Sequence, residues 1–117
     1  MSFSKVVSSK AVSENTAKLY KQQLNKLARE STVDTLEGLK SNPSTVIAWV
    51  TESTAAIEPT EKRNQARRLK YSAIFWALHG DAFLSQPDNP YRRAFHDADP
   101  ITTYDGQAWK KAYHFTD

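Results

Sequence analysis

The chain has 117 residues with a formal net charge of +3, three glycines, five prolines and no cysteine. This length predicts one domain with a modest core, and the lack of cysteine excludes disulfides, thiolate metal sites and cysteine nucleophiles. No apolar run is long enough to cross a bilayer, and the N-terminus lacks the apolar region of a secretory signal, so an intracellular location is expected, in the cytoplasm, the nucleus or a virion. The mildly basic balance permits nucleic acid as a partner but does not require it.

The first predicted element is an amphipathic helix that follows a flexible leader over residues 1–12. Ser13 is a good N-cap because its hydroxyl can accept from a free amide of the first turn, and Glu14 suits the positive end of the helix dipole. Apolar residues then recur at spacings of three and four up to about Glu30: Ala17, Tyr20, Leu24, Leu27 and Ala28. The basic residues fall largely outside this stripe: Lys18, Lys21, Lys26 and Arg29.

A second full helix is predicted after a short connector. Leu36 and Leu39 indicate one helical turn within the connector. Asn42 and Pro43 then form a start signal, because asparagine can cap a helix and proline suits its first position. The buried face of this helix is expected to carry aliphatic residues with an aromatic at its edge: Val46, Ile47 and Val50, with Trp49.

The third helix is predicted from the segment TEKRNQARRLKYSAIFWALHG, residues 60–80. Pro59 and Thr60 mark its start, and Gly80 is a typical C-terminal stop. The first half is crowded with charge, whereas the second half is apolar on nearly every side. A helix that is apolar all round is surrounded by other elements, so this segment is expected to form the centre of the domain.

The remaining sequence predicts a loop, one more helix and a tail. The segment DAFLSQPDNP, residues 81–90, is typical of a loop whose Phe83 and Leu84 pack back onto the core. The next helix has Pro90 at its first position and ends before Pro100, with Tyr91, Ala94 and Phe95 inward and Arg92, Arg93 and His96 outward. The tail, residues 101–117, has room for one short helix. No alternating run predicts a strand, so the predicted fold class is all-α, with four or five helices mainly over residues 13–100.

Three segments, taken in order, resemble the N-terminal core-binding domain of tyrosine recombinases, the SAM-like domain of phage integrases. The first, SENTAKLYKQQLNKL, is similar to the first helix of that family in Ser13, Thr16, Tyr20 and Leu24. The second is the aliphatic run with a central aromatic, VIAWV, at residues 46–50. The third is RRLKYSAIFWAL at residues 67–78, and the Asn-Pro of NPYRRAF then follows. The resemblance covers residues 13–96.

This resemblance implies a compact SAM-like orthogonal bundle that grips duplex DNA, in the recombination or integration of a viral or mobile element. In the family, the first and third helices both approach DNA. A recombinase also needs a larger catalytic domain with an Arg, His and Tyr cluster, and too few residues follow position 100 to supply one. The chain is therefore expected to be an excised DNA-binding half or a protein that kept only this half. The resemblance transfers no catalytic residue.

The strongest candidate site is the basic start of the third predicted helix. Five cations lie within nine positions beside a single acid: Lys62, Arg63, Arg67, Arg68 and Lys70. Arg63, Arg67 and Lys70 follow one another at four and three residues, so they are predicted to line one face. Phosphates would relieve the repulsion between these cations, and the planar arginine fork can grip two phosphate oxygens. The segment is therefore predicted to contact DNA.

Two further groups extend this candidate site. Asn64 and Gln65 lie among the cations and are suited to hydrogen-bond phosphate or an adenine edge. Lys18 and Lys21 of the first predicted helix form a second basic group. For all of these residues the alternative is an ordinary solvated helix face.

Aromatic residues crowd the tail: Tyr104, Trp109, Tyr113 and Phe115. Their commonest role is to cover an apolar patch of the same domain; the alternatives are docking on a protein partner, self-association and base stacking. A non-enzymatic protein–protein module, such as a virion or scaffold component of the same fold, is therefore the alternative function. A helical RNA-binding domain is a third.

No enzymatic activity is predicted. The three histidines, His79, His96 and His114, lack the spacing of metal ligands. The sequence contains neither a glycine-rich phosphate loop nor a Gly-x-Ser-x-Gly elbow. No metal, cofactor or membrane partner is expected, and double-stranded DNA is the expected partner.

Overall fold

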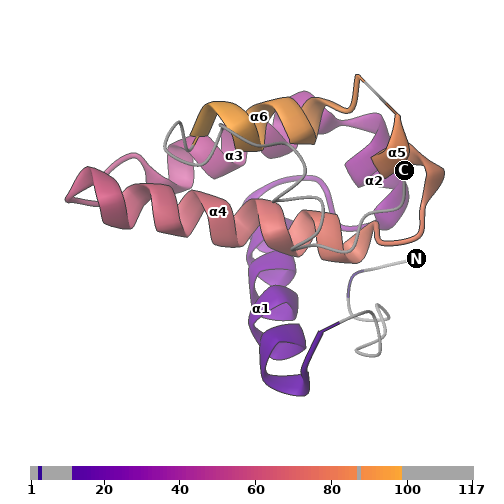
Figure 1. The fold of residues 1–117 in the computed structure, drawn as a ribbon, viewed down its shortest axis with the longest axis horizontal. Helices are drawn as coiled ribbons and strands as arrows, with labels where there is room; N and C mark the ends of the chain where they lie inside the picture. Colours follow the sequence, from indigo (N-terminus) through magenta and orange to yellow (C-terminus); the bar gives the residue numbers. More distant parts are fainter. Residues whose placement is uncertain (1–2, 4–11, 87, 99–117) are drawn as a thin grey trace.

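The computed structural model describes residues 3, 12–86 and 88–98, and within these residues the chain forms six α-helices and no strand (Figure 1). The all-α prediction is therefore confirmed. The helices are α1 (Glu14–Glu30), α2 (Leu36–Ser41), α3 (Pro43–Thr54), α4 (Thr60–Ala77), α5 (Ala82–Ser85) and α6 (Pro90–Ala98). The four long helices correspond to the four predicted ones, and α2 is the predicted turn in the connector. The predicted tail lies outside the described residues.

The short helix α5 differs from the predicted loop. The Asp81 side chain accepts a hydrogen bond of 2.8 Å from the backbone N–H of Phe83, which caps this single turn. Leu84 is buried and Phe83 packs against the core, as predicted. The proline and asparagine of this segment predict a loop, but the capping aspartate and two anchored apolar residues are enough for one turn.

Helix α1 forms where the sequence predicts it and for the predicted reason. The Ser13 hydroxyl accepts a hydrogen bond from the backbone N–H of Thr16, and an acid, Glu14, occupies the first turn. The helix buries one stripe: Ala17, Tyr20, Leu24 and Leu27. Of the expected flexible leader, only Phe3 and Val12 are described; Phe3 is buried, and Val12 packs against the core.

The centre of the domain is α4, as the sequence predicted. Every residue from Lys70 to Leu78 is buried. The Trp76 ring lies 5.8 Å from that of Tyr20 in α1, and the Phe75 ring lies 5.6 Å from that of Phe95 in α6. Helices α1, α3 and α6 all pack against α4, so its second half is enclosed on nearly every side.

The arrangement of the helices leaves part of α1 standing apart. In Figure 1, α1 crosses α4 steeply and its N-terminal turns project away from the other described helices. Helices α3 and α6 lie on the other side of α4, and the first turns of α4 extend past the crossing point. The exposed sides of α1 and of the start of α4 therefore meet in an open corner.

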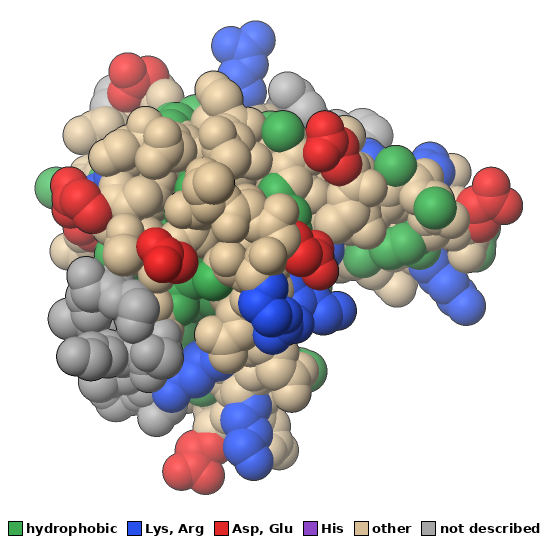
Figure 2. Space-filling view, turned by 180° about the vertical axis from the view of Figure 1, so that it is seen from behind, with side chains coloured by type: hydrophobic (Ala, Val, Ile, Leu, Met, Phe, Trp, Pro, Cys, Tyr) green, Lys and Arg blue, Asp and Glu red, His purple; other side chains and the backbone are tan. Residues whose placement is uncertain are grey.

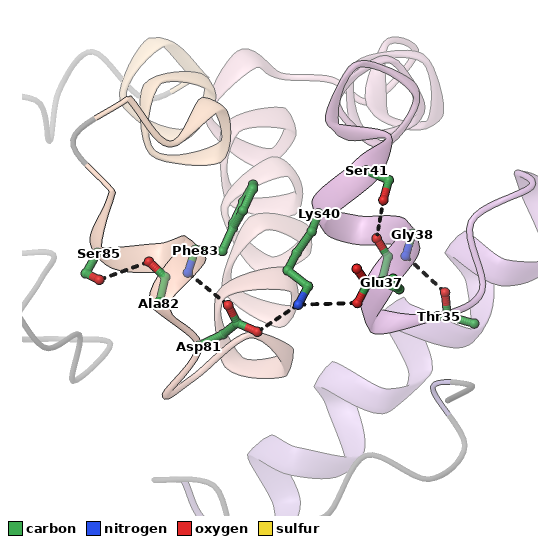
Figure 3. A network of polar contacts seen from close by, with 9 residues as sticks. All are labelled: Thr35, Glu37, Gly38, Lys40, Ser41, Asp81, Ala82, Phe83 and Ser85. Atoms are coloured by element: carbon green, nitrogen blue, oxygen red, sulfur yellow. Dashed lines mark hydrogen bonds and ion pairs between the residues drawn. The ribbon is translucent and has the colours of Figure 1, made fainter.

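A polar network fixes the turn after α4 to α2 (Figure 3). The Lys40 ammonium donates to the Asp81 carboxylate at 3.1 Å and lies 3.3 Å from the Glu37 carboxylate. The hydrogen bond to Asp81 raises the pKa of Lys40 above its ordinary value. Nearby, the buried Tyr91 hydroxyl donates to the Leu39 carbonyl, and burial raises the pKa of Tyr91. These contacts anchor the end of the molecule opposite the start of α4.

Candidate nucleic-acid interface

The basic cluster at the start of α4 divides into exposed and engaged residues. Lys62 is exposed, and the arginines Arg63, Arg67 and Arg68 are partly buried. The Arg63 guanidinium donates to the Thr60 hydroxyl at 3.1 Å on the surface. The Arg68 Nε atom is buried. Of the five cations of this cluster, Lys62 alone is exposed.

Lys70 is not on an exposed face, and this part of the sequence prediction is wrong. Its side chain is 8% exposed, and its ammonium lies 4.4 Å from the centroid of the Trp49 ring. The same ammonium donates to the Gln23 side-chain oxygen at 2.8 Å. Burial lowers the pKa of Lys70, and the nearby Lys26 lowers it further. Lys70 lies where α1, α3 and α4 meet. Its aliphatic stem covers apolar surface, and its ammonium makes contacts within the protein.

Arg67 is also engaged with a neighbouring helix. Its Nε donates to the Thr54 hydroxyl at 2.7 Å, and its Nη2 donates to the Thr51 carbonyl at 3.4 Å. Both acceptors belong to the last turn of α3, where free carbonyls favour a cation. The buried Thr54 hydroxyl in turn donates to the Val50 carbonyl. Arg67 therefore supports the C-terminal end of α3.

Two of the three residues in the predicted stripe, Arg67 and Lys70, face a different neighbour from the one expected. Arg67 and Lys70 both contact α3, through Thr54 and Trp49 respectively. The helical spacing correctly placed them on one side of α4, but that side packs on protein. Asn64, predicted beside them, is partly buried, and Gln65 is exposed.

Helix α1 carries the larger set of available cations. Lys18, Lys26 and Arg29 are exposed, and Lys21 is partly buried. Among the described residues, only Lys40 is the cation of an ion pair, and none of these four α1 cations forms a hydrogen bond. The acid at the end of this helix, Glu30, instead accepts a 2.9 Å hydrogen bond from the Trp49 indole. The outward side of α1 is therefore positively charged.

The basic side chains of α1 have polar and apolar neighbours on the same surface. Lys18 and Lys21 border a hollow of about 280 Å³ together with Glu14, Asn15 and Ala17. Leu19 is 48% exposed and is the one large exposed hydrophobic residue of the described part of the chain. Figure 2 shows the rear of the molecule, where Lys and Arg side chains gather on the projecting arm formed by α1 and at its junction with the body.

The other sequence candidates lie elsewhere or outside the described residues. Arg93 of α6 is exposed as predicted, whereas Arg92 is partly buried. The side chain of His96 and the aromatic tail lie outside the described residues. Within the described ranges, no three His, Asp or Glu side chains come together as metal ligands. No described helix is both long and apolar enough to cross a membrane.

The sequence prediction included Lys18 and Lys21 of α1 but not Lys26 and Arg29. These four charges are spread over about three turns, so they form no dense run like that of residues 62–70. The available signal was their position outside the apolar stripe of an amphipathic helix. Spacing on the helix, and not density along the chain, identifies this face.

Comparison with known proteins found no matching family model, no similar curated protein and no similar solved structure. The resemblance to the core-binding domain of tyrosine recombinases therefore stays a prediction from the residues.

Proposed function

We propose that this protein is a non-enzymatic DNA-binding domain that holds duplex DNA with the outward face of α1 and the first turn of α4. The observation that carries the proposal is the set of four α1 cations with no hydrogen bond or ion pair to another described residue: Lys18, Lys21, Lys26 and Arg29. Like charges on one helix repel one another, and DNA phosphates relieve that repulsion while releasing bound counterions.

The dimensions of the two elements suit a duplex. Helix α1 has 17 residues, which corresponds to a length of about 25 Å. Its projecting turns have the width that a major groove admits. Lys62 and Arg63 lie on the first turn of α4, beyond the crossing of the two helices, and are placed to meet a neighbouring stretch of backbone. Phosphate contacts of this kind fix the position of a protein on DNA.

Duplex DNA is favoured over a single strand because of where the aromatic residues lie. Single-strand binders stack successive bases on exposed aromatic side chains. In the described part of the chain every aromatic side chain is buried or partly buried, and most belong to the core. The proposed surface instead offers cations and amides, which suit phosphates and groove edges.

The resemblance to the core-binding domain of tyrosine recombinases supports the same function. It implies a domain that clamps duplex DNA during recombination or integration, with its first and third predicted helices, here α1 and α4, toward the DNA. On α4, however, Arg67 and Lys70 have intramolecular roles, so the proposed contact moves from these residues toward α1. Lys62, Arg63 and, at its edge, Asn64 remain the α4 contribution.

The test is a salt titration of binding. Fluorescence anisotropy of a labelled 20-base-pair duplex should show a linear fall of log affinity with log salt, with a slope of about −5 if six cations meet phosphates. The triple variant Lys18→Ala, Lys26→Ala, Arg29→Ala should lower the magnitude of that slope by about 3. Arg93→Ala removes an exposed arginine on α6, across α4 from the projecting turns of α1, and is the matched control.

Two results would contradict the proposal. One is the absence of any duplex binding at about 50 mM salt, where phosphate contacts are strongest. The other is a triple variant whose slope equals that of the wild type while Arg93→Ala reduces it. In that case the cations of α1 do not contact DNA.

A further inference from the structure

The outward face of α1 carries three amide side chains among its cations. Asn15, Gln22 and Asn25 are all exposed. Within the described part of the chain, none of the three side chains forms a hydrogen bond. The fourth amide of the helix, Gln23, points the other way and accepts from the Lys70 ammonium. Gln23 therefore links α1 to α4, whereas the other three amides are available to a partner.

Helical geometry places the three available amides on one side of α1. Gln22 follows Asn15 by seven residues, and Asn25 follows Gln22 by three, so all three share the side opposite the buried stripe. At 1.5 Å per residue, Gln22 and Asn25 are about 4.5 Å apart along the axis, and Asn15 is about 10.5 Å from Gln22. Lys18, Lys26 and Arg29 lie on the same side. The amides thus occupy the middle of the basic face.

Asn25 lowers the intrinsic stability of helix α1. Asparagine is a poor helix former in the interior of a helix, because its side chain competes for backbone hydrogen bonds in other conformations. Asn25 lies in the interior of α1 and is exposed. Its side chain forms no hydrogen bond with another described residue that would offset this cost.

We propose that Gln22 and Asn25 read adenine in the major groove of duplex DNA, so that binding depends on sequence. The inference rests on the proposed function, in which the outward face of α1 meets the duplex. A carboxamide presents one acceptor and two donors, which match the N6 donor and N7 acceptor of adenine in the major groove. The flanking cations hold the backbone on either side, and the amides then face the base edges between them.

The spacing of the amides suits successive base pairs. Base pairs rise about 3.4 Å along the duplex axis, so Gln22 and Asn25 are placed to meet neighbouring pairs. Asn15 lies about three base pairs farther along. The proposal therefore assigns the two central amides to the bases and leaves Asn15 at the edge of the same site.

The experiment is a selection of bound duplexes from a random 20-base-pair pool with the full chain. The wild type should enrich sites that share a short adenine-containing element. Replacing adenine in that element should weaken binding roughly 5- to 150-fold, the range for a bidentate amide contact. Gln22→Ala, Asn25→Ala should lose this preference and bind a mixed-sequence duplex within about threefold of the wild type, because the phosphate contacts remain.

Gln86→Ala removes an exposed amide after α5, away from the projecting turns of α1, and is the control that should keep the preference. A wild type that binds the pool with a clear salt dependence but enriches no sequence would overturn the inference and leave the proposed function standing. Retention of the same preference by the double variant would overturn it as well. A wild type that binds no duplex at all would reject both the proposed function and this inference.

Discussion

The basic residues of α1 and of α4 behave differently although both sets lie on amphipathic helices. On α4 the cations are dense in sequence, yet Arg67 bonds to the last turn of α3 and Lys70 lies over Trp49. On α1 the cations are spread over about three turns, and none of them pairs with another described residue. Density of charge along a chain therefore does not predict which charges are available to a partner.

The number of packed neighbours explains the difference. Helix α4 lies against α1, α3 and α6, so most of its circumference is covered. A cation on such a helix reaches another helix before it reaches solvent. Helix α1 buries one stripe, and its N-terminal turns project from the body (Figure 1). Its remaining circumference is open, and charges placed there stay hydrated until a partner binds.

The largest expected effect is a loss of stability on replacing Arg67, a cation of α4 that contacts α3. The variant Arg67→Ala should lower the free energy of unfolding by about 1–2 kcal/mol, because the buried Thr54 hydroxyl loses its charged donor. Urea unfolding followed by circular dichroism measures this change. Lys62→Ala, an exposed lysine on the same helix, should change stability by less than about 0.5 kcal/mol.

The structural role of Arg67 would be contradicted if these two variants of α4 behaved alike. Equal losses of stability at Arg67 and Lys62 would mean that the contact with α3 adds nothing. DNA binding gives a second check. If Arg67→Ala reduced the salt dependence of binding as much as the α1 triple variant does, Arg67 would contact phosphate directly.

A smaller effect is expected in the pH dependence of stability at Lys70. Burial lowers the pKa of the folded-state ammonium below the ordinary lysine value. Between the folded and unfolded pKa values the unfolded chain binds more protons, so the contribution of this group to stability rises with pH toward about 10.4. The stability of the wild type relative to Lys70→Met should therefore increase between about pH 8 and pH 10.4.

This pH test isolates Lys70 because other groups are common to both proteins. The Lys40 ammonium, whose pKa is raised by Asp81, titrates in the wild type and in the variant, so its effect cancels. Urea unfolding at the two pH values gives the difference. A constant difference would show that folding does not change the pKa of Lys70, and a difference that falls with pH would show that folding raises it; either result would contradict the account.

Local sequence patterns were sufficient for the helices and for much of the core. Spacing and capping predict the buried stripe of α1, the start of α3 at Pro43 and the enclosed second half of α4. Helix α4 ends at Ala77, and the predicted stop residue Gly80 follows in the turn, with a φ of 84° that glycine adopts easily. The sequence does not predict the short helix α5, because its only start signal is the capping aspartate Asp81.

The neighbour that each cation of α4 contacts could not be predicted from the sequence. The ammonium of Lys70 meets Gln23, 47 residues away, and the guanidinium of Arg67 meets Thr54, 13 residues away. Helical periodicity shows which residues share a side, but not which neighbouring helix covers that side. Trp49, expected at the edge of its face, is only 7% exposed because it lies under Lys70 and bonds to Glu30.

The most direct test of the central claim is a titration of the isotopically labelled protein with a short DNA duplex, followed by nuclear magnetic resonance. If α1 provides the interface, the backbone signals of residues 15–29 and of Lys62 and Arg63 should shift or broaden first. The side-chain signals of Trp49 and Lys70 should stay in place, since their contacts belong to the fold. Shifts confined to residues 67–70, with α1 unchanged, would contradict the account.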